Sequence, residues 1–135
     1  MSPSTPHTVA DAPLVLVVDD TETNLKLARD ILRADGLRTV EAASGAQALE
    51  LATSVQPDVI LLDLQLPDMD GIEVVRELRA RTSTSPIPVV ALTALRIGND
   101  DGWLRAAGFS ACIEKPIDTR DFAARVRSYA ARRTS

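Results

Sequence analysis

Hydrophobic and polar positions alternate in blocks along this chain, with short apolar runs separated by segments that have helical spacing. The runs are Leu14–Val18, Thr39–Ala42, Val59–Leu62, Val89–Leu92 and Ala111–Ile113. Their ends, at positions 18, 42, 62, 92 and 113, lie 20 to 30 residues apart. Each interval has room for one strand, one helix of about 10–12 residues and two short loops. Continuous runs indicate strands buried on both faces of a parallel sheet.

The segments between the runs carry apolar stripes at helical spacing, together with residues that start and stop helices. The stripes are Leu25–Leu32, Ala46–Ala52, Ile72–Leu78, Asn99–Ala107 and Phe122–Tyr129. Gly36 and Gly108 are expected to end the first and fourth helices. Ser44 and Gln47 form a capping box ahead of the second. The pattern predicts an α/β fold of five strand–helix units, (βα)₅, with a doubly wound parallel sheet.

Composition narrows the class of protein further. The 135 residues, 14.5 kDa, predict one domain at 14–135 behind a mobile arm at 1–13, which is rich in Pro, Ser and Thr. A single Cys and a single His exclude an internal disulfide, a cysteine metal cage and a histidine-based triad. The apolar runs are too short to span a membrane, and the start does not resemble a signal peptide. We therefore expect a cytoplasmic protein without membrane insertion.

Charge argues against nucleic-acid binding. The net charge is −4, from 19 acidic and 15 basic residues. The end of the chain is locally basic, with Arg120, Arg125, Arg127, Arg132 and Arg133. We interpret these arginines as the solvated face of a terminal helix, and no direct contact with nucleic acid is expected.

Chemically reactive side chains follow the predicted strands. Asp19 and Asp20 come after the first strand, Asp63 after the third, Thr93 after the fourth and Lys115 after the fifth. In a parallel sheet with right-handed crossovers, these positions meet at one edge, where ligands bind. Clustered carboxylates require a cation or a shared proton, and an all-oxygen site favours Mg²⁺. Together with lysine and threonine donors, such a site suits a phosphoryl group.

Four motifs around these residues resemble one known family. They are Val17-Val18-Asp19-Asp20, Leu61-Leu62-Asp63-Leu64-Gln65-Leu66-Pro67-Asp68-Met69-Asp70-Gly71, Ala91-Leu92-Thr93-Ala94 and Glu114-Lys115-Pro116. The chain is similar to the receiver domain of bacterial two-component response regulators, from about Leu14 to Tyr129. Thr23-Asn24-Leu25-Lys26-Leu27 and Lys115-Pro116-Ile117-Asp118 further resemble stand-alone cell-cycle-type regulators and hybrid-kinase receivers. The resemblance implies the flavodoxin-like strand order 2-1-3-4-5.

The resemblance also implies a role for each residue of the cluster. Asp63 would accept a phosphoryl group from a phosphohistidine of a sensor kinase or phosphotransfer protein. Asp19, Asp20 or both would hold Mg²⁺ with Asp63 and the backbone carbonyl of Gln65. Thr93 and Lys115 would contact phosphoryl oxygens, and the Lys115–Pro116 bond would be cis.

As a receiver, the protein would be a signalling phosphoacceptor that catalyses only its own phosphoryl transfer and loss. A downstream protein would bind the face of the fourth helix, fifth strand and fifth helix, and no output domain is expected. Two alternatives stay open. A Mg²⁺-dependent aspartyl phosphatase would need a second aspartate where this chain has Gln65. A pseudo-receiver would keep the fold without phosphorylation.

Cys112 departs from the family pattern, which usually has Tyr or Phe at this switch position on the fifth strand. We expect an inert thiol packed against the fifth helix, so that coupling from Thr93 passes through the fourth helix instead. Three further aspartates are interpreted structurally. Asp68 is expected in a turn, Asp70 at the start of the third helix and Asp118 at the start of the fifth.

Overall fold

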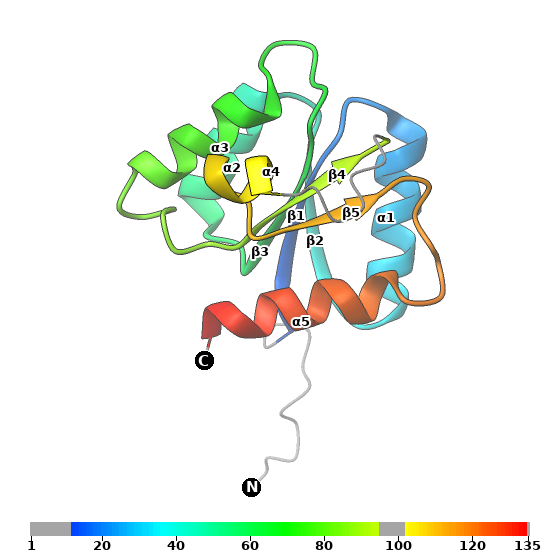
Figure 1. Ribbon diagram of the computed structural model, residues 1–135. Coiled ribbons are helices and arrows are strands. Elements are labelled where there is room, and N and C mark those ends of the chain that lie inside the picture. Colours follow the sequence, from blue (N-terminus) through cyan, green and yellow to red (C-terminus); the bar gives the residue numbers. More distant parts are fainter. Residues whose placement is uncertain (1–11, 95–101, 135) are drawn as a thin grey trace, which may run out of the picture.

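The computed structural model describes residues 12–94 and 102–134. The strands are β1 (Leu14–Val18), β2 (Arg38–Ala42), β3 (Val59–Asp63), β4 (Val89–Thr93) and β5 (Ala111–Glu114). The helices are α1 (Glu22–Ala34), α2 (Gly45–Val55), α3 (Gly71–Ala80), α4 (Gly102–Ala107) and α5 (Phe122–Thr134). Strands and helices alternate along the chain, which confirms the predicted (βα)₅ order (Figure 1).

All strands belong to one parallel sheet with the order β2-β1-β3-β4-β5, as expected. Every residue of the central strands β3 and β4 is buried, and in β1 only the first residue, Leu14, is half-buried. The edge strands differ, because each has a neighbour on one side only. β2 and β5 mix buried with half-buried or exposed residues.

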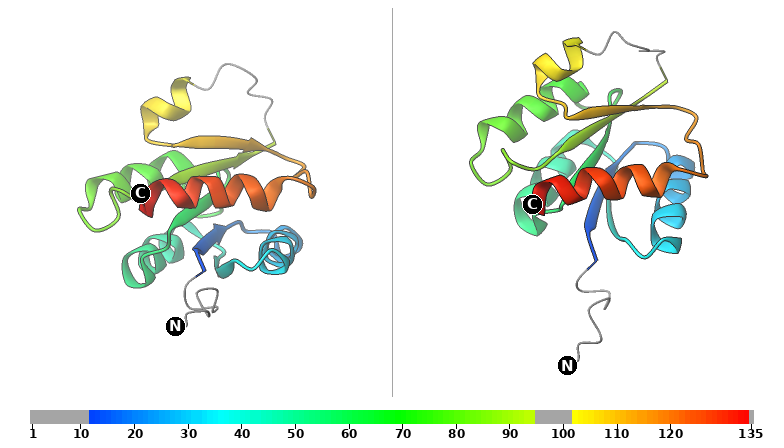
Figure 2. Two further views of the ribbon diagram at one scale, coloured as in Figure 1. Left: turned by 90° about the horizontal axis from the view of Figure 1, so that it is seen from below. Right: turned by 60° about the horizontal axis from the view of Figure 1, so that its bottom comes forward.

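Helices cover both faces of the sheet (Figures 1 and 2). One apolar core lies between the sheet and α2, α3 and α4. A second core lies between the sheet and α1 and α5. Successive residues along a strand point to opposite faces, so neighbours such as Leu61 and Leu62 belong to different cores.

The predicted helix boundaries are largely confirmed. Gly36 and Gly108 follow α1 and α4 with φ of 89° and 120°, a conformation that favours glycine. The Ser44 hydroxyl accepts the backbone N–H of Gln47 (3.2 Å), as a capping box requires. The Gln47 side chain reaches back to the backbone N–H of Ala43 (2.9 Å), one residue before the cap.

One predicted detail differs from the structure, and two others lie wholly or partly outside the described residues. The Asp118 carboxylate accepts the backbone N–H of Arg120 (3.0 Å) in a turn, and α5 begins only at Phe122. The described part of the fourth helix begins at Gly102, and its predicted start at Asn99 lies outside the described residues. Most of the predicted arm, residues 1–11, also lies outside them.

Candidate functional site

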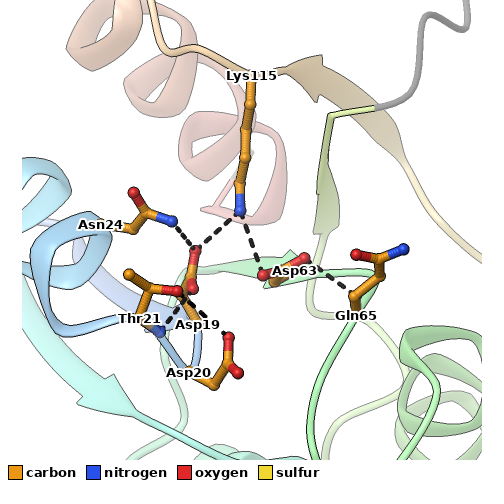
Figure 3. A network of polar contacts seen from close by, with 7 residues as sticks. All are labelled: Asp19, Asp20, Thr21, Asn24, Asp63, Gln65 and Lys115. Atoms are coloured by element: carbon orange, nitrogen blue, oxygen red, sulfur yellow. Dashed lines mark hydrogen bonds and ion pairs between the residues drawn. The ribbon is translucent and has the colours of Figure 1, made fainter.

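The carboxyl ends of the strands meet at one edge of the sheet and line an open cavity of about 600 Å³. Asp63 is the last residue of β3 and Thr93 the last of β4. Asp20 follows β1, and Lys115 follows β5. All four line the cavity, and Gln65 lies beside them. The predicted cluster is therefore assembled in space, and Figure 3 shows Lys115 reaching toward the aspartates from the end of β5.

Asp19 is the most enclosed carboxylate of the site, with 1% of the residue exposed. Its Oδ1 accepts the backbone N–H of Thr21 (2.9 Å). Its Oδ2 accepts both the Lys115 ammonium (3.0 Å) and the Asn24 amide (3.3 Å). Both oxygens are thus held by donors of the protein itself.

Asp20 and Asp63 present their oxygens differently. Asp20 is exposed, and its described contact is the Thr21 hydroxyl at 3.5 Å. Asp63 is 7% exposed and accepts the Gln65 backbone N–H (3.0 Å) and the Lys115 ammonium (3.2 Å) on separate oxygens. One carboxylate oxygen each of Asp19, Asp20 and Asp63 lies within 4.8 Å of the others. Such an all-oxygen group could hold a hard divalent cation such as Mg²⁺.

Burial and the neighbouring charges together shift two pKa values at the site. Burial raises the pKa of Asp63 above its ordinary value of 3.8, and the Asp19 charge adds to this effect. The Gln65 N–H and the Lys115 ammonium act in the opposite direction without outweighing it. Burial alone would lower the pKa of Lys115, but its hydrogen bonds and charge pairing with Asp19 and Asp63 raise it. Lys115 is therefore a stable cation beside a carboxylate that is costly to ionise.

The pKa of Asp63 gives a testable pH dependence for the metal-free protein. A carboxyl whose pKa is raised by folding binds its proton more tightly in the folded state, so its ionisation destabilises the fold. In EDTA, we expect wild-type protein to lose stability relative to Asp63→Asn as the pH rises from 3.8 through the raised pKa. Urea unfolding of both proteins between pH 3.5 and pH 7.5 measures this difference. A constant difference across that range would contradict the expected pKa.

Thr93 lies at the wall of the cavity and is 3% exposed. Its backbone carbonyl accepts the N–H of Lys115 (2.7 Å), which joins the end of β4 to the loop after β5. The peptide bond between Lys115 and Pro116 is cis, as the resemblance implies. The two expected phosphoryl contacts thus sit side by side.

Sequence reasoning missed two residues of the site. Asn24 lies on α1 next to the buried Leu25 and donates to Asp19, but asparagine on a helix gives no signal of this contact. Trp103 lines the cavity from α4 and is 44% exposed. Its place in the cavity depends on how α4 packs, which the sequence pattern does not determine.

Asp68 was expected in a turn, but its carboxylate has a further role. It accepts the backbone N–H groups of Gly45 (2.8 Å) and Ala46 (3.0 Å) and so caps α2 from another part of the chain. Asp70 caps α3 as predicted, accepting the N–H of Ile72 (3.0 Å).

The expectation that the Cys112 thiol packs against the fifth helix is wrong. Cys112 is half-buried and packs against the core beneath α2, α3 and α4, whereas its strand neighbours Ala111 and Ile113 face α5. The alternation of side chains along β5 explains this, since Cys112 lies between two residues of the α5 face. From α5, Arg125 donates to the backbone carbonyl of Cys112 (3.3 Å).

Two of the basic residues near the end of the chain form ion pairs within the protein. Arg127 pairs with Asp35 after α1 (3.0 Å), and Arg120 pairs with Asp118 (3.3 Å). Arg127 thus joins α5 to the end of α1 while remaining half exposed, and the Arg120 pair is local to the turn before α5. Within the described residues, no helix has the length and apolar character needed to cross a membrane.

Comparison with known proteins identifies the family. The family model for the response regulator receiver domain matches residues 15–127. The chain belongs to the response regulator receiver family. This receiver is 41% identical over 115 residues to the polar-differentiation response regulator DivK of Brucella ovis. The aligned region covers 85% of this chain and 94% of the relative. The predicted class, a signalling receiver of two-component systems, is confirmed.

Solved receiver structures have the same fold. The chemotaxis protein CheY4 of Vibrio cholerae matches with a TM-score of 0.81 at 25% identity, over 87% of this chain and 98% of that one. The receiver domain of the sensor histidine kinase PA1611 from Pseudomonas aeruginosa matches with a TM-score of 0.79 at 29% identity. That match covers 89% of this chain and 98% of the other. The PA1611 domain has a magnesium ion coordinated in its active-site cleft.

Proposed function

We propose that Asp63 accepts a phosphoryl group from a phosphohistidine of a histidine kinase or phosphotransfer protein, in a reaction that requires Mg²⁺. The observation that carries this proposal is the position of the Asp63 carboxylate in the open cavity. It lies 3.2 Å from the Lys115 ammonium and shares a carboxylate cluster with the exposed Asp20. A nucleophile beside a fixed cation and a metal-ligating group is suited to phosphoryl transfer.

The metal site we propose consists of oxygen ligands only. The side chains of Asp19, Asp20 and Asp63 and the backbone carbonyl of Gln65 would hold the ion. The clustering of the three carboxylates and the absence of His or Cys from the cluster support Mg²⁺. When bound, Mg²⁺ would neutralise the negative charge that the phosphoryl group brings to the site.

Residues of this chain would then perform the phosphoryl transfer. An Asp63 carboxylate oxygen forms a bond to phosphorus while the phosphorus–nitrogen bond of phosphohistidine breaks. The electron pair of the broken bond stays on the imidazole nitrogen, which takes up a proton from solvent. The product on Asp63 is an acyl phosphate, whose oxygens the Lys115 ammonium and the Thr93 hydroxyl would bind.

We further propose that residues 14–135 act as one receiver unit and signal through protein–protein contacts on the face of α4, β5 and α5. Thr93 would move toward the phosphoryl group, and its movement would reach α4 and the neighbouring β5, on which Cys112 lies. Two observations support this route. Thr93 pairs in register with Glu114 of β5, and the cavity extends from Thr93 to Trp103 of α4.

Phosphoramidate and Mg²⁺ test the proposed function directly. We expect intact-mass spectrometry to detect one phosphoryl group per chain, slow decay of that adduct, and no uptake when EDTA removes Mg²⁺. Lys115→Ala should slow the uptake strongly. A wild-type protein that takes up no phosphoryl group from phosphoramidate would contradict the proposal, and rapid turnover of phosphoesters would favour a phosphatase.

A further inference from the structure

The N-terminus of α2 is capped by two different parts of the chain. Ser44, directly before the helix, accepts the N–H of Gln47 (3.2 Å). The preceding N–H groups, those of Gly45 and Ala46, donate instead to the two oxygens of Asp68 at 2.8 and 3.0 Å. Asp68 belongs to the loop between β3 and α3, which begins directly after the phosphoacceptor candidate Asp63. This loop, residues 64–70, is called the acceptor loop below.

The acceptor loop packs closely on α2. A Cβ atom at Gly45 would lie 2.8 Å from the sulfur and 3.0 Å from the Cβ of Met69 in this loop, and 3.0 Å from a methyl group of Val74 on α3. A side chain at position 45 would therefore require Met69 and Val74 to shift. The helix N-terminus favours a negative charge there. The same two hydrogen bonds lower the pKa of Asp68 below its ordinary value of 3.8.

The acceptor loop is also closed on itself. The Gly71 N–H donates to the Leu64 carbonyl (3.0 Å), and Gln65 forms an antiparallel bridge with Asp70. At Gly71, a Cβ atom would lie 2.9 Å from the Leu64 Cα. Because the loop is held together in this way, a change in how it sits on α2 also displaces Gln65.

Gln65 connects this loop to the site. Its N–H donates to the Asp63 carboxylate (3.0 Å), and its carbonyl is one of the proposed metal ligands. We propose that Asp68 is a positioning residue for the metal site. By holding the acceptor loop against α2, it fixes the Gln65 carbonyl and the Asp63 carboxylate where both can bind Mg²⁺. This inference rests on the metal site of the proposed function.

The test compares Asp68→Ala with Ser44→Ala in the full chain. Both variants remove hydrogen bonds from the first turn of α2, but only Asp68→Ala releases the acceptor loop. Isothermal titration calorimetry with MgCl₂ should give an affinity about tenfold weaker for Asp68→Ala, as is usual when the support of a metal ligand is lost. Ser44→Ala should bind Mg²⁺ like wild-type protein. The urea midpoint of unfolding should fall in both variants, because each loses hydrogen bonds at the start of α2.

A third variant separates the positioning role of Asp68 from the effect of its negative charge on Mg²⁺ affinity. Asp68→Asn removes the charge but keeps one oxygen acceptor, so its Mg²⁺ affinity should fall between those of wild type and Asp68→Ala. The Asp68→Ala loss should also persist in about 0.5 M salt, where the Debye length of roughly 4 Å screens a distant surface charge. A loss that disappears in salt would mean that Asp68 acts only through its field, which overturns the inference.

Two other outcomes would also overturn it. Unchanged Mg²⁺ affinity in Asp68→Ala would show that the loop is held without Asp68. Equal weakening in Ser44→Ala and Asp68→Ala would assign the effect to the stability of α2. In both cases wild-type protein would still bind Mg²⁺ and take up a phosphoryl group, so the proposed function would stand. A wild-type protein that binds no Mg²⁺ would end both proposals.

Discussion

Asp63→Asn protein is expected to take up no phosphoryl group from phosphoramidate under conditions that modify wild-type protein completely. The asparagine amide keeps the shape of the side chain but lacks a carboxylate oxygen that can attack phosphorus. Its fold should survive, because asparagine removes a negative charge that is buried next to Asp19. The raised pKa of Asp63 indicates that this charge is unfavourable in the folded protein. Intact-mass spectrometry measures the uptake, and circular dichroism checks the fold.

Asp70→Asn is the matched control for this experiment, since Asp70 lines the same cavity and lies in the same loop. Asparagine serves as well as aspartate at a helix N-cap, so α3 should keep its start. We expect Asp70→Asn to be phosphorylated like wild-type protein. Two results would place the phosphoacceptor elsewhere. One is phosphorylation of Asp63→Asn at the wild-type rate, and the other is loss of phosphorylation in Asp70→Asn alone.

Arg79→Met should lower the free energy of unfolding by about 2–3 kcal/mol, which is large for a residue far from the site. The Arg79 guanidinium donates to the carbonyls of Gly108 (2.8 Å), Ser85 (2.8 Å) and Ile87 (2.6 Å). It thereby joins the end of α3 to the segments before β4 and β5. Methionine fills similar space but leaves these carbonyls without their charged donor.

Urea unfolding of Arg79→Met, Arg79→Lys and Arg76→Met tests this expectation. Arg76 is exposed on the same helix, so its replacement should change the stability little. Lysine cannot donate in the planar fork geometry of arginine and should restore only part of the loss. If Arg79→Met unfolds within about 0.5 kcal/mol of Arg76→Met, the hydrogen bonds from Arg79 to these three carbonyls contribute no net stability.

The sequence pattern predicts the central strands and the convergence of Asp19, Asp63, Thr93 and Lys115 because both follow from local rules. A strand buried on both faces must be continuously apolar, and parallel strands bring their carboxyl ends to one edge. Neither rule requires knowledge of how the helices pack.

Contacts that depend on helix packing could not be predicted in the same way. Asp68 caps a helix that begins 23 residues earlier in the chain, so no local motif contains both partners. Arg79 reaches a carbonyl 29 residues away for the same reason. Cys112 is a different case, because strict alternation along the edge strand β5 already assigns it to the opposite face from Ala111 and Ile113.

The two cores on either side of the sheet place adjacent residues of one strand in different packing environments. Leu61 and Leu62 are covalent neighbours, yet one packs toward α1 and α5 and the other toward α2, α3 and α4. Substitutions at such adjacent positions therefore disturb contacts with different helices, although the backbone that they share can couple their effects on stability. The proposed partner face of α4, β5 and α5 spans both cores, so a partner bound there would contact helices that pack on opposite sides of the sheet.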